Sequence, residues 1–143
     1  MFMSLKGSAQ MPIRATQGSA GFDIFAMEDV YLLKRATVKV PTGIRMQIPV
    51  GYYGQLLSRS SLAAQNITVE GGVIDSDYRG EICVLLKNNN DREFVIKTDL
   101  AIAQLVFLQC FLPQLFIVVP EEELTSTGRG IGGFGSTDCM QRI

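Results

Sequence analysis

The sequence predicts an all-β protein built as a distorted jelly roll or β-barrel. Short apolar segments rich in β-branched and aromatic residues recur along the chain, and Gly, Pro, Asn and Asp separate them. Helical periodicity is almost absent. The 143 residues, 47% of them hydrophobic, suffice for one domain with a buried core. We expect this domain over residues 1–124, followed by a flexible glycine-rich arm over 125–143.

The expected strands lie at residues 22–26, 30–33, 37–40, 44–48, 52–57, 82–86, 94–97, 102–112 and 115–119. Pro41–Gly43 reads as a turn between two of them, and Asn88–Asp91 as a turn that ends another. The segment 102–112 fits a helix or a strand, and its β-branched and aromatic residues favour a strand. A single short helical turn is expected over 62–65.

A strand–turn–strand motif over Gly71–Ile82 is the most informative segment. An apolar strand runs into Asp75, and the chain turns near Gly80 before a second apolar strand. A carboxylate held at such a bend and open to solvent can take a proton from water. The residues alone leave another interpretation open, in which Asp75 bonds its own backbone in the turn. Asp77, closer to the turn, is expected to have that structural role.

The sequence contains no histidine, which excludes imidazole zinc sites and Ser-His or Cys-His nucleophiles. Proton transfer would then depend on carboxylates, and any metal would be a hard cation with oxygen ligands. The three cysteines are an odd number without CxxC spacing, so we expect free thiols in a reducing compartment.

The net charge of −1 and the lack of a Lys/Arg block argue against a nucleic-acid partner. No apolar run reaches the roughly 20 residues that span a membrane, and no signal peptide is evident. We therefore expect no membrane partner and an intracellular protein of the cytoplasm, the nucleus or both.

The glycine-rich segment after Thr125 holds one arginine, Arg129, and one aromatic residue, Phe134, among small and hydroxyl side chains. One interpretation is a disordered tail. The other is a flap that orders over a nucleotide, because glycines let backbone N–H groups approach a phosphate and Phe134 could stack on a base.

Five segments form a set when taken together. They are 20–26 (AGFDIFA), 58–63 (SRSSLA), the strand–turn–strand motif, 102–106 (IAQLV) and 129–137 (RGIGGFGST). In this order they closely resemble the motifs of the trimeric dUTPases, deoxyuridine 5'-triphosphate nucleotidohydrolases, over residues 10–138. The resemblance implies hydrolysis of dUTP to dUMP and pyrophosphate with Mg²⁺, which limits uracil in DNA and supplies dUMP. It also implies a homotrimer whose subunits share each active site.

The resemblance implies a role for each motif. Asp75 would activate the water that attacks the α-phosphate, and Tyr78 would pack under the deoxyribose and leave no room for a 2′-hydroxyl. The main-chain groups implied in uracil recognition are those of Val69, Gly72, Val73 and Ile74. The implied phosphate contacts are Arg59, Ser60, Ser61, Gln104, Arg129, Gly135, Ser136 and Thr137, while Phe134 would stack on uracil. Asp23 and Gln104 would hold Mg²⁺ through water molecules.

Some positions depart from the family pattern. Ser58 and Ser61 stand where proline and glycine are usual, Glu70 replaces a small residue, and Ala101 replaces a basic one. None of these changes removes a reacting group, although Glu70 has no evident place beside the uracil strand.

Besides a nucleic-acid-binding β-barrel, which the net charge disfavours, two alternatives remain. The related dCTP deaminases share the fold and the Arg-Ser-Ser-Leu-Ala segment, but this chain has Ala64 and Leu85 where they carry an arginine and a glutamate. A non-catalytic relative used for binding or signalling would be expected to lack Asp75, Arg59 or the arm, and all are present.

Overall fold

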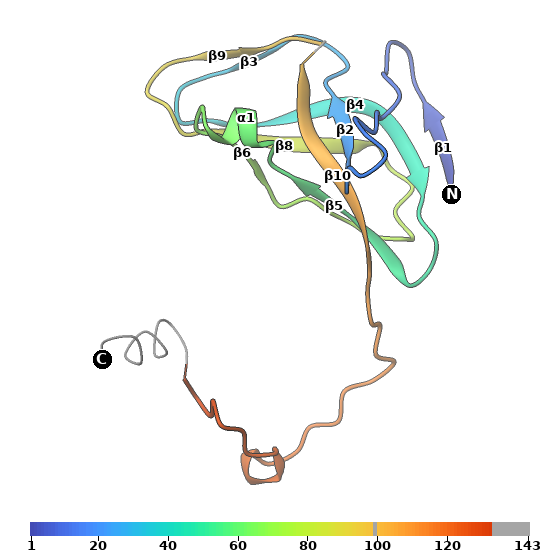
Figure 1. The fold of residues 1–143 in the computed structure, drawn as a ribbon, viewed down its shortest axis with the longest axis vertical. Coiled ribbons are helices and arrows are strands. Elements are labelled where there is room, and N and C mark those ends of the chain that lie inside the picture. The colour runs from blue at the N-terminus through green and yellow to red at the C-terminus, as the bar shows by residue number, and fades with distance from the viewer. Residues whose placement is uncertain (99, 133–143) are drawn as a thin grey trace. The chain divides into compact units, whose positions relative to one another are not determined.

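The computed structural model describes residues 1–98 and 100–132 (Figure 1). Two compact units divide the chain, residues 1–112 and residues 113–143, and each is described by itself. The strands of the first unit are β1 (Phe2–Leu5), β2 (Phe22–Phe25), β3 (Val30–Leu32), β4 (Thr37–Gln47), β5 (Tyr52–Leu57), β6 (Ile67–Glu70), β7 (Val73–Ile74), β8 (Ile82–Asn88), β9 (Phe94–Ile96) and β10 (Ala101–Gln109). The single α-helix of the described residues is α1 (Ser60–Ala63), and a 3-10 turn, η1 (Glu121–Glu123), lies in the second unit.

Two four-stranded antiparallel sheets and a small two-stranded one form the first unit. The first sheet has the order β1-β4-β8-β6 and the second the order β2-β10-β5-β7, while β3 pairs with β9. Sequence neighbours are mostly not sheet neighbours, as expected for a jelly-roll-like fold. The all-β prediction is confirmed.

The core takes alternate residues from the strands of both sheets. Along β8, Ile82, Val84 and Leu86 are buried, whereas Leu85 faces outward. The buried residues that the second sheet adds to the same cluster are Ile24, Leu56, Ile102, Ala103 and Leu105. The period-two pattern therefore holds one face of each sheet in the core and leaves the other face for pockets.

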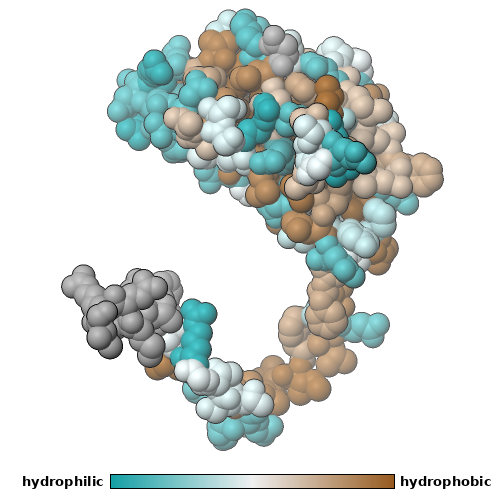
Figure 2. Space-filling model, viewed as in Figure 1, coloured by the Kyte–Doolittle hydropathy of each residue, from teal (hydrophilic) through white to brown (hydrophobic). Residues whose placement is uncertain are grey.

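Strand β4 corrects the sequence interpretation at Pro41–Gly43. We expected a turn there, but one strand runs through these residues, with Pro41 opposite Cys83 and a register shift before Ile44. A proline donates no ladder hydrogen bond, so it is tolerated beside such an irregularity. The predicted strand over 115–119 is also wrong, because these residues form no strand in the described structure. They are apolar and exposed (Figure 2).

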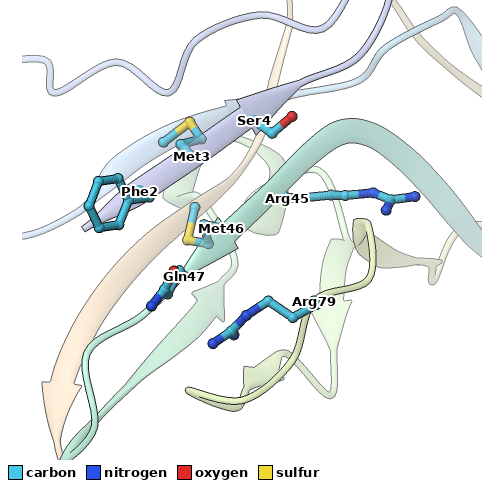
Figure 3. A pocket seen from close by; sticks show the side chains of 7 residues that line it. All are labelled: Phe2, Met3, Ser4, Arg45, Met46, Gln47 and Arg79. Carbon is cyan, nitrogen blue, oxygen red and sulfur yellow. The ribbon is translucent and has the colours of Figure 1, made fainter.

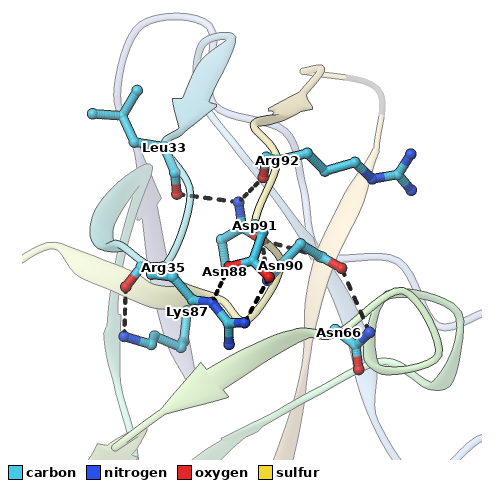
Figure 4. A network of polar contacts seen from close by, with 8 residues as sticks. All are labelled: Leu33, Arg35, Asn66, Lys87, Asn88, Asn90, Asp91 and Arg92. Atoms are coloured by element: carbon cyan, nitrogen blue, oxygen red, sulfur yellow. Dashed lines mark hydrogen bonds and ion pairs between the residues drawn. The ribbon is translucent and has the colours of Figure 1, made fainter.

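A buried asparagine, Asn88, ties together the turns at one end of the first unit (Figure 4). Its amide nitrogen donates to the carbonyl oxygens of Leu33 and Arg92 at 3.1 and 2.8 Å, and its Oδ1 accepts the Asn90 N–H at 3.0 Å. The Asn90 amide nitrogen in turn donates to the Gln65 carbonyl oxygen at 2.8 Å. This network fixes the chain that leaves α1.

Two further expectations concern bonding and membranes. Cys83 and Cys110 are free thiols, as expected, and Cys139 lies outside the described residues. Among residues 1–98 and 100–132, no helix is both long and apolar enough to cross a membrane.

Candidate functional site

The Gly71–Ile82 segment, here called the hairpin, is not a paired β-hairpin, because β7 and β8 belong to different sheets. Gly72 brings its start against β5. The Leu56 N–H donates to the Gly72 carbonyl oxygen at 2.8 Å, and β7 continues the pairing with β5. The φ of Gly72 is +102°, and a Cβ atom there would lie 2.7 Å from the Leu56 carbonyl oxygen. The position therefore requires glycine for its backbone conformation and for the close approach to β5.

The main chain of Val73 points away from β5. β7 is the edge strand of its sheet, and Val73 pairs with Gln55 between the Gly72–Leu56 and Ile74–Gly54 pairs. Hydrogen-bonded and non-hydrogen-bonded pairs alternate along an antiparallel ladder. Since Leu56 bonds Gly72, the N–H and C=O of Val73 face the open edge, where a ligand can pair with them.

The turn is closed without help from its carboxylates. The Tyr78 N–H donates to the Asp75 carbonyl oxygen at 3.2 Å, and Arg79 Nη1 donates to the Ser76 and Tyr78 carbonyl oxygens at 2.7 and 2.9 Å. Neither the Asp75 nor the Asp77 carboxylate has a hydrogen-bond partner within the described part of the chain. The structural role expected for Asp77 is therefore not seen, and the Asp75 carboxylate is free.

Asp75 and Tyr78 line one pocket of about 430 Å³ between the hairpin and the outward face of β4 and β8. Its lining is completed by Lys39, Val73, Ile74, Glu81, Ile82, Cys83 and Leu85. Burial raises the pKa of the Cys83 thiol; Glu81 adds to this rise, and Lys39 opposes it. A raised thiol pKa disfavours the reactive thiolate, so Cys83 is not a candidate nucleophile of this pocket.

Two more pockets adjoin the hairpin. One, of about 360 Å³, contains Asp75 and Asp77 together with Tyr52 and Tyr53, so Asp75 stands between two hollows. The other, of about 260 Å³, lies between β1, β4 and Arg79 (Figure 3). Its lining residues include no carboxylate, so it offers no general base.

A second polar group forms where β2, β10 and β5 lie side by side. Gln104 on β10 is opposite Asp23 on β2 and Leu57 on β5. Arg59, just after β5, pairs through Nη2 with Asp23 Oδ2 at 3.2 Å and donates through Nη1 to the Ala101 carbonyl oxygen at 3.1 Å. The sequence-predicted Asp23, Arg59 and Gln104 are thus brought together, and the ion pair orients the guanidinium.

The start of α1 presents two hydroxyl groups beside Arg59. Arg59 is the N-cap residue, and Ser60 and Ser61 are exposed in the first turn. Leu62 is buried and anchors the turn, while Asn90 holds the chain just after it. The expected helical turn at 62–65 is present but begins two residues earlier.

Ser58 is a functional neighbour that sequence reasoning missed. Its Oγ accepts the Val69 N–H at 2.8 Å, and its carbonyl oxygen accepts Gln104 Nε2 at 3.2 Å. The Val69 N–H is therefore occupied within the chain, and a role of Val69 in uracil recognition stays a prediction for its carbonyl group. The replacement of the family's usual proline by Ser58 was the signal that could have indicated this contact.

Glu70 also finds its place in the structure. It is exposed at the end of β6, opposite Leu85, and its Oε1 accepts a hydrogen bond from Thr68 Oγ1 at 3.1 Å. It is not among the residues that line the Asp75 pocket. Its substitution for a small residue therefore leaves the pocket intact.

Too few ligand side chains lie together in the described structure to coordinate a metal ion directly. Among the described residues, no three His, Cys, Asp or Glu side chains form a metal-binding group. The contacts of Asp23 and Gln104 leave Asp23 Oδ1 and Gln104 Oε1 without a described protein partner. Directly opposed residues on neighbouring strands share a face of the sheet. Two oxygens so placed fit Mg²⁺ that keeps its waters, as Mg²⁺ commonly does.

The remaining predicted residues belong to the arm. Arg129 Nε donates to the Gly132 carbonyl oxygen at 2.8 Å, within the second unit. Phe134, Gly135, Ser136 and Thr137 lie outside the described residues.

Comparison with known proteins agrees with this geometry. A family model described as dUTPase matches residues 7–138. The chain belongs to the dUTPase family. It is 45% identical to the deoxyuridine 5'-triphosphate nucleotidohydrolase of Paramecium bursaria Chlorella virus 1 over 131 residues, 91% of each chain. The enzyme of the same name from Chlamydia felis is 39% identical over 142 residues, 96% of this chain and 97% of that one.

Solved dUTPase structures share the fold. The dUTPase of Staphylococcus bacteriophage 80alpha with dUpNHpp has a TM-score of 0.86 and 30% identity, covering 94% of this chain and 96% of that one. A mutant dUTPase from phage phi11 of S. aureus, described with a structural Mg(II) ion, has a TM-score of 0.77 and 27% identity. That match covers 85% of this chain and 99% of the phage protein. Family membership places the chain among the hydrolases of nucleotide metabolism.

Proposed function

We propose that the chain hydrolyses dUTP to dUMP and pyrophosphate, with Asp75 as the general base. The observation that carries this proposal is the free Asp75 carboxylate in the pocket that also holds Tyr78. A carboxylate without competing hydrogen bonds can accept the proton of a water that attacks the α-phosphate. The family's relatives bear the name of this activity.

Uracil and deoxyribose would be selected at the hairpin. The outward N–H and C=O of Val73 can pair with the donor and acceptor groups of uracil, and cytosine would meet mismatched groups. The Tyr78 ring would pack under the sugar and occupy the space of a ribose 2′-hydroxyl. Leu85 lines this pocket at the position where the dCTP deaminases carry a glutamate, which supports hydrolysis rather than deamination.

The phosphates would bind at the group formed by Arg59, Ser60, Ser61 and Gln104. The guanidinium and the hydroxyl groups would stabilise the negative charge that develops during phosphoryl transfer. Asp23 and Gln104 would hold Mg²⁺ through water molecules. When bound, Mg²⁺ neutralises phosphate charge. Asp23 also orients Arg59 through the ion pair.

We also propose a homotrimer with shared sites, in which no nucleic acid or membrane takes part. Within one chain the hairpin strand β7 borders β5 on one edge, while Gln104 on β10 and Asp23 on β2 lie beyond its other edge. A site that uses both groups is therefore most simply built from two subunits. A third subunit would contribute the arm over 125–143, with Arg129 and Gly135, Ser136 and Thr137 on the phosphates and Phe134 on uracil. The enzyme would act in the cytoplasm, the nucleus or both, limiting uracil in DNA and supplying dUMP.

A nucleotide panel tests the proposed function. Pyrophosphate release is measured with dUTP, UTP, dCTP and dTTP, each with Mg²⁺ and with a chelator. We expect rapid turnover of dUTP alone, and its loss on chelation. Equal rates on all four nucleotides would refute the selectivity at Val73 and Tyr78, and failure to hydrolyse dUTP would refute the activity.

A further inference from the structure

The Tyr78 ring is held in one orientation although it lies in an exposed turn. The residue is 43% exposed, and its hydroxyl donates to the Glu81 carbonyl oxygen at 2.9 Å. A side chain on an exposed turn usually samples several rotamers. The hydrogen bond across three residues selects one of them, which folds the ring back over Gly80.

Gly80 supplies the space for this orientation. A Cβ atom at Gly80 would lie 2.3 Å from the Tyr78 hydroxyl oxygen, 2.5 Å from Cζ and 2.8 Å from Cε2. These separations are far below van der Waals contact. The φ of Gly80 is not in the left-handed region, so glycine is needed here for space and not for backbone conformation.

Glu81 fixes the carbonyl group that the tyrosine uses. Its Oε1 accepts the Gly43 N–H at 2.9 Å, at the register shift of β4, where the N–H needs a partner outside the ladder. The neighbouring Thr42 Oγ1 donates to the Ile82 carbonyl oxygen at 2.6 Å. Two side-chain hydrogen bonds thus join the end of the hairpin to the irregular part of β4.

We propose that Gly80 and Glu81 are positioning residues that set the Tyr78 ring and so determine selectivity for deoxyribose over ribose. This inference rests on the proposed dUTP hydrolysis. Gly80 leaves room for the ring, and Glu81 holds the hydrogen-bond acceptor in place against β4. A displaced ring would admit a 2′-hydroxyl, while Asp75 would keep its position on the other side of the turn.

The test displaces the ring by a single methyl group. The clash in Gly80→Ala is with the end of the Tyr78 side chain, so the ring can move while the backbone stays in place. We expect kcat/KM for dUTP relative to UTP to fall about tenfold or more, with KM for dUTP raised and kcat changed less than about threefold. Gly18→Ala is the matched control, because a Cβ at Gly18 meets nothing within 4 Å.

A second pair of variants tests the contact of Glu81 with Gly43 independently. This pair is a sufficient test if Gly80→Ala does not fold. Glu81→Ala removes the acceptor of the Gly43 N–H, and we expect the same loss of dUTP preference. Glu81→Gln retains an acceptor oxygen and should keep the wild-type ratio. An unchanged ratio in Glu81→Ala, or in a folded Gly80→Ala, would overturn the inference while wild-type dUTP hydrolysis stands. A wild-type protein inactive on dUTP would instead refute the proposed function beneath it.

Discussion

Replacing Gly72 by alanine should move the hairpin away from β5. The φ of +102° is sparsely populated for any residue with a Cβ, at a cost of about 1–3 kcal/mol. The new Cβ would lie 2.7 Å from the Leu56 carbonyl oxygen and must move by roughly half an ångström or more to reach normal contact. That shift weakens the 2.8 Å hydrogen bond from the Leu56 N–H, worth about 1 kcal/mol. We expect the free energy of unfolding to fall by about 3 kcal/mol in total.

Gly71→Ala is the matched control for this prediction. Gly71 also has a positive φ, +63°, but a Cβ there meets nothing within 4 Å. It should cost about 1 kcal/mol from backbone conformation alone. Urea unfolding at one fixed protein concentration, with kcat/KM for dUTP alongside, measures both variants. We expect the activity of Gly72→Ala to fall about 100-fold because the hairpin is misplaced, and that of Gly71→Ala to change little. Equal destabilisation by the two variants would refute the close approach of Gly72 to β5.

Three other predictions address assembly, the arm and pH. Mixing Asp75→Asn with Arg59→Ala under conditions that exchange subunits should restore part of the dUTP hydrolysis that each lacks; no restoration would contradict shared sites. A chain that ends at Thr127 should keep its oligomeric state in sedimentation but lose most hydrolysis, and an unchanged kcat/KM would exclude a role for the arm. The pKa of Asp29 is lowered by hydrogen bonds from the Lys97 side chain and the Thr98 N–H, and by the charge of Lys97. Its stabilising contribution is thus present above its ordinary pKa of 3.8 and lost as pH falls through the lower folded-state value. Asp29→Asn should flatten the acid limb of the stability curve, and an unaltered limb would contradict this pairing.

Local patterns in the sequence were sufficient to predict most of the strands. Strand β5 (Tyr52–Leu57) has the bounds expected from its aromatic and apolar residues, and β10 is a strand as its β-branched content indicated. The turn predicted at Pro41–Gly43 was wrong because these residues belong to a strand that pairs with β8. That pairing is a long-range contact that no local sequence pattern encodes. The prediction of a strand over 115–119 was wrong because this segment lacks a partner strand in the described structure. Apolar residues form a stable strand only where they pair with another strand.

The site was predictable where chemistry depends on residue type, and less so where it depends on packing. The carboxylate at Asp75 and the cluster of Asp23, Arg59 and Gln104 followed from motifs, and the structure brings the cluster together. The contact of Ser58 with Val69 joins two segments that meet only in the folded chain, and its one sequence signal was the serine at the family's usual proline position. The close approach of Tyr78 to Gly80 is local, but it depends on the rotamer of Tyr78, which the sequence does not specify.

The most direct measurement compares Asp75→Asn with Asp77→Asn. Both carboxylates are exposed in the same turn and lack hydrogen-bond partners among the described residues, so the two variants differ mainly in which carboxylate is removed. Calorimetric binding of dUTP and pyrophosphate release are measured on each protein. If Asp75 is the general base, Asp75→Asn binds dUTP within about threefold of wild type but loses roughly 10²–10⁴ in kcat, while Asp77→Asn stays near wild type. A near-normal kcat in Asp75→Asn would contradict the assignment of Asp75 as the base.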